Sequence, residues 1–231
     1  MTVSRDRSPD ITRPDAGTVL VTESSAHHLT VEEIVAAVEH APWPEELISF
    51  STLVSTDGET TLTYTQWAHG EAGHEFMAGL TGAEPVEYRL YRSSERENPP
   101  VPGCVVVVSV EFGGPDDQRQ QHWIDAVFDA MAGEAQPHPG GISGHFHTST
   151  DGTRVLNYAE WTDEQAHRDA LDKSGQATVG SSPGWRRVVD FPGVKSGGFR
   201  RYYLRYSRSA ASSAELSERS GRDEVLDSPA G

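Results

Sequence analysis

The sequence predicts an α+β protein made of two consecutive copies of one β-α-β-β-α-β unit. The first observation is a repeated motif: Ser-Thr-Asp-Gly occurs at 55–58 and at 149–152, followed each time by Leu, Tyr and Trp at equal distances. The separation is 94 residues (149 minus 55), which indicates a tandem duplication. The second is that β-branched runs alternate with apolar residues at helical spacing. The third is the Asp-Gly pair itself, a hairpin signal in each unit.

Each unit is predicted to open with a strand and continue into a helix. The strands are Thr18–Glu23 and Cys104–Glu111, because β-branched residues dominate both. The first helix begins at a capping box of Thr30 and Glu33, and the second begins near Pro115, where acidic residues suit the positive helix start. Apolar residues recur on one helix face at Val31, Ile34, Val35 and Val38, and at Ile124, Val127, Phe128 and Met131.

A hairpin, a shorter helix and a last strand complete each unit. Thr162 and Gln165 are predicted to cap the shorter helix of the second unit, and the last strands are Val86–Arg92 and Arg200–Ser207. This order is the ferredoxin-like arrangement, an antiparallel sheet with helices on one face. Since the other face needs cover, the two units are expected to form a dimeric α/β-barrel-like pseudo-dimer in which their sheets pack together.

The domain boundaries follow from composition. Residues 17–93 form the first predicted unit and residues 104–207 the second, with a proline-containing linker at 94–103. Residues 1–16 and 208–231 are predicted to be disordered, because they contain few apolar residues.

The composition narrows the class of partner. With 35 acidic and 19 basic residues among 231, the formal charge is −16, which disfavours binding to nucleic acid or to anionic lipid. No apolar run approaches the about 20 residues of a membrane span, and the polar N-terminus lacks the apolar part of a secretory signal. Cys104 is the single cysteine, so a disulfide framework is excluded. We expect a cytoplasmic protein that binds a small molecule.

The two units differ most in the hairpin of the second one. His145 and His147 stand where the first unit has Ser and Leu, and Asn157 stands where it has Thr63. His145 and His147 share one strand face, and Asn157 and Trp161 share one strand face. The two faces coincide if the turn is a three-residue loop with Gly152 left-handed, and they oppose if it is a two-residue turn.

The second unit also carries about twenty additional residues before its last strand, since the offset between matching tyrosines grows from 94 to 114. Trp185, Arg186 and Arg187 lie in this insertion among glycines and prolines. We expect it to form a lid or the rim of a pocket.

The stretch Phe146–Trp161 resembles the central hairpin of the antibiotic biosynthesis monooxygenases, small ferredoxin-like enzymes that oxygenate anthrones and related polyketide aromatics. The resemblance implies that Asn157, Trp161 and His147 are catalytic pocket residues. It places His167 near a family tyrosine and makes Arg186 or Arg187 the candidate for a pocket arginine. The first unit lacks the Asn and the His, so the resemblance implies a non-catalytic copy.

The tandem length resembles the oxygenases that open the B ring of angucyclinones in jadomycin, gilvocarcin or kinamycin-type pathways. That resemblance implies O₂ as co-substrate, no metal and no tightly bound cofactor, with reduced flavin supplied by a flavin reductase as partner. A homodimer is a further expectation.

The residues permit a mechanism for such a reaction. Asn157 would stabilise a substrate anion, His147 would move a proton, and Trp161 and Trp185 would stack on a flat polycycle. An arginine would offset phenolate charge. His145, Trp123 and His167 complete the candidates for substrate binding.

Each assignment has an alternative. Trp161 matches Trp67 and is equally suited to a core position, Asn157 can satisfy backbone groups, and His145 with His147 can be a metal pair. At the level of function, an anthrone-type oxygenase that forms a quinone and a non-catalytic small-molecule binding module are the alternatives to ring opening.

Overall fold

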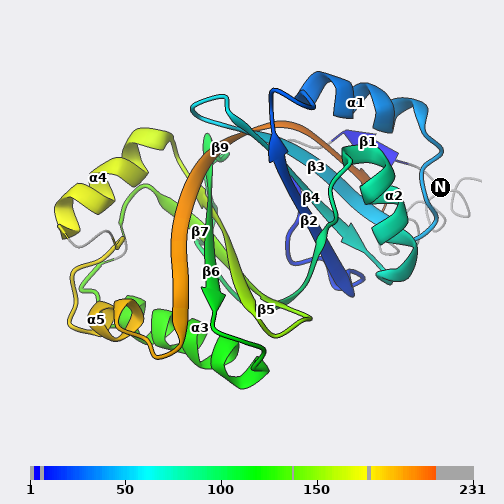
Figure 1. Ribbon diagram of the computed structural model, residues 1–231. Helices are drawn as coiled ribbons and strands as arrows, with labels where there is room; N and C mark the ends of the chain where they lie inside the picture. The colour runs from blue at the N-terminus through cyan, green and yellow to red at the C-terminus, as the bar shows by residue number, and fades with distance from the viewer. Residues whose placement is uncertain (1–2, 6–7, 137, 176–177, 212–231) are drawn as a thin grey trace, which may run out of the picture.

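In the computed structural model, the described residues form one antiparallel nine-stranded sheet, of which the eight strands from β2 to β9 close into a barrel with helices on its outside (Figure 1). The structure describes residues 3–5, 8–136, 138–175 and 178–211. The strands are β1 (Val3–Arg5), β2 (Thr18–Ser25), β3 (Leu47–Ser55), β4 (Thr60–Trp67), β5 (Val86–Glu95), β6 (Cys104–Phe112), β7 (Gly141–Ser149), β8 (Arg154–Trp161) and β9 (Val194–Ala210). The helices are α1 (Val31–His40), α2 (Glu71–Thr81), α3 (Asp117–Ala132), α4 (Glu164–Ser174) and α5 (Gly184–Val189).

The order β-α-β-β-α-β occurs twice along the chain, with α5 added before β9. Within the sheet the first unit contributes β3-β4-β2-β5 and the second β7-β8-β6-β9, which is the same order in both. The α+β class and the ferredoxin-like arrangement are therefore confirmed. A shared origin of the two units stays a prediction.

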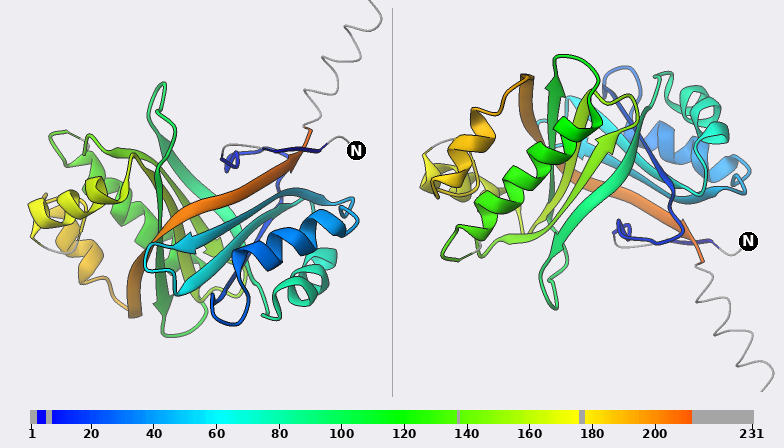
Figure 2. Two further views of the ribbon diagram at one scale, coloured as in Figure 1. Left: turned by 90° about the horizontal axis from the view of Figure 1, so that it is seen from above. Right: turned by 90° about the horizontal axis from the view of Figure 1, so that it is seen from below.

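The last strand of each unit joins the two units. β5 pairs with β2 up to Tyr88 and with β7 from Tyr88 onward. β9 pairs with β6 up to Tyr202 and with β3 from Tyr202 onward. The barrel-like closure is confirmed, and the inner faces of the two units pack together in one core. Backbone hydrogen bonds also join the units into one continuous sheet, which the sequence did not predict. The views in Figure 2 show β9 running between the two helix layers.

The inside of the barrel is filled by apolar and aromatic side chains from both units. Leu62 and Tyr64 of β4 meet Leu156 and Tyr158 of β8 there. Ile11 belongs to the same cluster and is 4% exposed. The disorder predicted before Thr18 is therefore wrong for the segment around Ile11, which buries apolar surface against the barrel.

Some predicted boundaries also need correction. β5 continues to Glu95, into the predicted linker, and β9 continues to Ala210, beyond the predicted end of the second unit. Residues 212–231 of the predicted disordered C-terminus lie outside the described residues. The cap of α4 is Asp163, which accepts a hydrogen bond from the backbone N–H of Ala166, and not the predicted Thr162. The Thr30–Glu33 capping box is confirmed.

Candidate functional site

The register of the second hairpin decides which predicted residues lie together. Asn157 pairs with Phe146, and His147 pairs with Leu156, so Asn157 and His147 point to opposite faces of the sheet. Gly152 is left-handed, with φ of 74°, but the connection between β7 and β8 spans 150–153, an even number of residues. The prediction of one chamber shared by Asn157 and His147 is therefore wrong.

His147 lies inside the barrel and is fully buried. Its Nδ1 is 3.4 Å from the carbonyl oxygen of Leu156, and its Nε2 is 2.9 Å from the hydroxyl of Tyr64. Because a carbonyl only accepts, Nδ1 carries the proton and Nε2 accepts from Tyr64. Burial, followed by the nearby His145, lowers the pKa of His147 to about 3. His147 thus links the two units as a neutral hydrogen-bonding residue, away from Asn157.

His145 also faces inward and is 3% exposed. Its Nδ1 lies 3.0 Å from the hydroxyl of Ser93 and 3.8 Å from a carboxylate oxygen of Glu95. Burial lowers its pKa to about 4, opposed by the charge of Asp10. The predicted place of His145 in a pocket with Asn157 is wrong for the same reason of register.

Asn157 lies on the outer face of the second unit, which the helices cover in part. Its Oδ1 is buried and has no hydrogen-bond partner among the described residues. Two apolar clusters flank this position, and Val108 and Val179 pack against both of them. An unpaired buried amide oxygen costs about 1–3 kcal/mol, so a group that supplies a donor here gains that amount.

The cross-strand partner of Asn157 on this face is Phe146, but the next residue of β7 on the same face is a glycine. This residue, Gly144, pairs with Ala159, which lies two residues from Asn157 along β8. A Cβ added to Gly144 would lie 3.5 Å from Oδ1 of Asn157. Asn157, Gly144 and Val108 are half-buried rather than buried. The face is therefore partly open around the amide.

The equivalent face of the first unit is closed. Every residue of β4 is buried, and the hydroxyl of Thr63 is hydrogen-bonded to that of Thr22. Trp67, Leu20 and Phe50 form a buried apolar cluster with Met77 of α2 on the same side of the sheet. The first unit thus fills with side chains the place that is half-open in the second.

Trp161 shares the outer face with Asn157 and is 5% exposed. The ring of His167 on α4 packs edge-on against it with centroids 4.9 Å apart, and His138 lies at 5.5 Å. Trp161 belongs to the apolar cluster with Cys104, Val106 and Ala159. This packing matches the core alternative stated for Trp161 and places the indole at the edge of the Asn157 region.

His167 connects this cluster to β9. Its Nδ1 accepts a hydrogen bond of 3.0 Å from Nε of Arg201, and its ring packs against Phe199 with centroids 5.0 Å apart. Burial, and then the positive charge of Arg201, lowers the pKa of His167 to about 4. His167 is therefore neutral near pH 7, with its remaining N–H at Nε2.

Phe199 and Arg201 are functional candidates that the sequence reasoning missed. Phe199 pairs with Val108 and Arg201 with Val106, so both lie on the face of Asn157. The guanidinium of Arg201 is 5.0 Å from the ring centroid of Phe199. The alternation Phe199, Arg201, Tyr203 is the signal that would have found them, but the predicted strand began at Arg200.

The other predicted residues lie in the layer of α3 and α5. Trp123 and Trp185 are buried in one apolar cluster, and Nε1 of Trp185 donates to Glu134 over 2.9 Å. Arg186 and Arg187 are exposed on α5. Two other arginines lie on the face of Asn157: Arg201 of β9, and Arg92 of β5, which is ion-paired with Asp125.

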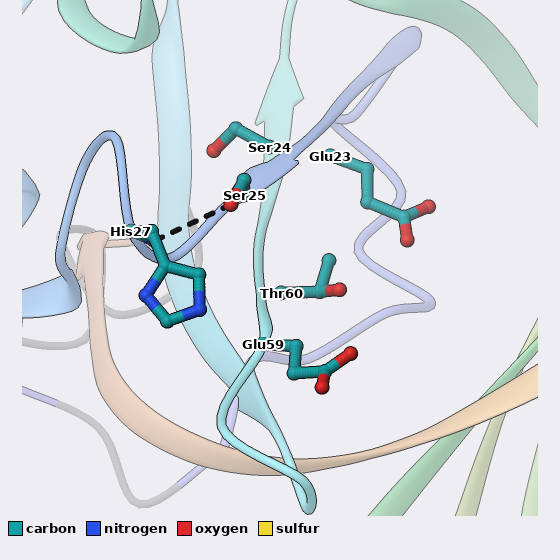
Figure 3. A pocket seen from close by; sticks show the side chains of 6 residues that line it. All are labelled: Glu23, Ser24, Ser25, His27, Glu59 and Thr60. Carbon is teal, nitrogen blue, oxygen red and sulfur yellow. Dashed lines mark hydrogen bonds between the residues drawn. The ribbon is translucent and has the colours of Figure 1, made fainter.

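Two pockets lie elsewhere on the surface. One, of about 670 Å³, is lined by polar residues of the first unit, shown in Figure 3: Glu23, Ser24, Ser25, His27, Glu59 and Thr60. The second, of about 450 Å³, lies at one end of the barrel interior and also includes Glu23.

Across the described ranges, no group of three or more His, Cys, Asp or Glu residues is arranged to hold a metal ion. In the same ranges, no helix has the length and apolarity needed to cross a bilayer.

Part of the second unit matches a known protein family. Residues 105–178 match the antibiotic biosynthesis monooxygenase family. This segment contains Asn157, Trp161 and His167, so the resemblance of the second hairpin to that family is confirmed. No protein with a curated description matches the chain.

Solved structures extend the likeness to both units. An anthrone oxidase-like protein is 19% identical over 86% of this chain and 95% of its own, with a TM-score of 0.61. A ferredoxin-fold protein related to antibiotic biosynthesis monooxygenases, from Listeria monocytogenes, is 14% identical over 82% and 95%, with a TM-score of 0.50. At 19% and 14% sequence identity, these two matches show that the chains share a fold and nothing more specific.

Proposed function

We propose that the protein is an oxygenase of electron-rich aromatic polyketides and that the face around Asn157 binds the substrate. The observation that carries this proposal is the unpaired, buried Oδ1 of Asn157 on a half-open face. That face lies within the segment that matches the monooxygenase family. The closed face at Thr63 supports a non-catalytic role for the first unit.

The polar groups on this face suit a phenolic polycycle. Asn157 lies on β8 and Arg201 on β9, and β6 lies between these strands. Two strand spacings and an offset of two residues along the strands separate their backbones by about 12 Å, a distance that fused aromatic rings can span. Arg201 would attract the oxygen of a phenolate. Oδ1 of Asn157 would accept a hydrogen bond from a substrate hydroxyl, and Nδ2 would donate one to a second substrate oxygen. The apolar side chains Val106, Val108 and Phe199 would contact the ring faces.

These residues also decide how the proton leaves. His167 is a weak base because its pKa is about 4 and Arg201 already occupies Nδ1. We therefore assign anion stabilisation to Arg201 and Asn157, with the phenolic proton passing to solvent. The resulting phenolate gives an electron to O₂, and the radical pair combines to a peroxide on the ring.

For the finer assignment we propose oxidative cleavage of the B ring of an angucyclinone. One oxygen atom of the peroxide would insert into a C–C bond in Baeyer–Villiger fashion, and the other would leave as water. This reaction consumes two electrons and two protons in addition to O₂. Reduced flavin supplied by a flavin reductase would be the reductant, entering as a diffusible co-substrate.

An anthrone-type reaction is the second candidate, favoured by the structural likeness to the anthrone oxidase-like protein. It converts a ring CH₂ and O₂ into a ring C=O and water, so it needs no other reductant. The two reactions differ in product mass and in dependence on the reductase.

The test compares two equivalent positions. Purified protein is incubated with an anthrone, or with an angucyclinone plus reduced flavin, and products are followed by mass spectrometry. We expect Asn157→Ala to lower kcat/KM at least about 100-fold, the usual effect of losing an oxyanion donor. Thr63→Ala, the matched control, should change it less than twofold.

Each other outcome has a meaning. Equal losses at both positions would contradict a non-catalytic first unit. Full turnover by Asn157→Ala would contradict the site. Substrate binding without any turnover by the wild type would favour a non-catalytic binding module.

A further inference from the structure

The pocket of about 450 Å³ at the end of the barrel interior lies on the sheet face opposite Asn157. Its inward-facing lining alternates along β6, at Val107, Ser109 and Glu111. Arg154 of β8 and Glu23 of β2 line it from neighbouring strands. It therefore opens beside the face proposed for oxygenation but is separated from it by the sheet.

Missing side-chain volume creates the pocket. Gly198 of β9 pairs with Ser109 of β6, so two of the smallest residues are neighbours on the inner face. A Cβ added to Gly198 would meet no atom within 4 Å. The volume is within the about 300–1,000 Å³ typical of small-molecule sites.

The charges around this space leave one cation without a partner. Glu23 forms an ion pair with Arg200 and accepts a hydrogen bond from the hydroxyl of Tyr202. Glu111 forms an ion pair with Lys195. Among the described residues, the guanidinium of Arg154 has neither a hydrogen bond nor an ion pair, although Glu111 and Asp151 lie near enough for its charge to lower their pKa.

We infer that this pocket is a second binding site, for a small aromatic carboxylate. An uncommitted guanidinium binds a carboxylate through two parallel hydrogen bonds. Val107 and the ring of Tyr202, which face the inside of the barrel, supply apolar wall for an aromatic body. The two acidic residues of the lining are already neutralised by Arg200 and Lys195, so one added negative charge matches Arg154.

The test uses 2-naphthoate as probe and isothermal titration calorimetry as readout on the full chain. We expect Arg154→Met to weaken binding at least tenfold and Gly198→Leu, which fills the space, to abolish it. Arg89→Met is the matched control, because Arg89 is exposed on β5, and it should bind like the wild type. The neutral 2-naphthamide should bind at least tenfold more weakly than 2-naphthoate.

Thermal unfolding of each variant checks that the fold is kept. A folded Arg154→Met and a folded Gly198→Leu that both bind 2-naphthoate like the wild type would overturn the inference, as would absence of binding to the wild type. Binding that is lost in Asn157→Ala but kept in Arg154→Met would place the probe on the oxygenation face and would also overturn it.

Discussion

Tyr88 and Tyr202 mark equivalent crossing points between the two units. Tyr88 pairs with Val19 of its own unit and with Ser149 of the other. Tyr202 pairs with Val105 of its own unit and with Ser55 of the other. Each tyrosine therefore stands where a strand leaves one set of hydrogen bonds and enters another, and the barrel interior between them is built by both units.

The Tyr64–His147 hydrogen bond lies in this shared interior and should stabilise it. Tyr64→Phe leaves Nε2 of His147 without a donor in a fully buried place, so we expect the free energy of unfolding in urea to fall by about 1–3 kcal/mol. The control is Tyr203→Phe, whose hydroxyl bonds Glu164 near the surface, with an expected change below about 0.5 kcal/mol. Equal losses of unfolding free energy in the two variants would contradict a larger stabilising contribution from the buried hydrogen bond.

The lowered pKa of His147 predicts a dependence of stability on pH. The unfolded chain binds a proton at this residue below about pH 6.5, whereas the folded chain does so only near pH 3. Stability from this group is complete above pH 6.5 and is lost as the pH falls toward 3. Between pH 6.5 and 5.0, the wild type should lose about 1.6 kcal/mol more than His147→Gln in urea unfolding. Parallel losses in the two proteins would contradict this.

Asn157 and Thr63 should respond oppositely to apolar replacement. Asn157→Leu removes an unpaired buried oxygen, so the unfolding free energy should stay constant or rise by about 1 kcal/mol. Thr63→Val deprives Thr22 of its partner inside a closed core and should lower it by about 1 kcal/mol. Urea unfolding of both variants measures the difference. A large loss for Asn157→Leu would mean that the amide has a structural partner.

Arg201 should control the titration of His167. Burial and the nearby Arg168 and His138 would still lower the pKa of His167 in Arg201→Met, so this pKa, now about 4, should rise while staying below its ordinary value. Titration of the imidazole by NMR measures this shift. Arg205→Met, a change on the same strand, should leave the titration of His167 where it is.

Local signals predicted the fold well and the site only in part. The capping box at Thr30 and the β-branched runs act within a few residues, and their elements form where predicted. Whether Asn157 and His147 share a face depends on whether the turn between β7 and β8 has an odd or an even number of residues, and the sequence was compatible with both. Phe199 was missed because β9 begins at Val194, before the predicted start at Arg200.

The crossing of β5 and β9 has a consequence for the peptide that joins the units. Because each unit holds a strand of the other by backbone hydrogen bonds, the covalent connection through Pro99 and Pro100 contributes little to their union. A protease nick at this exposed stretch would leave two interlocked fragments that still migrate as one particle and separate only on denaturation.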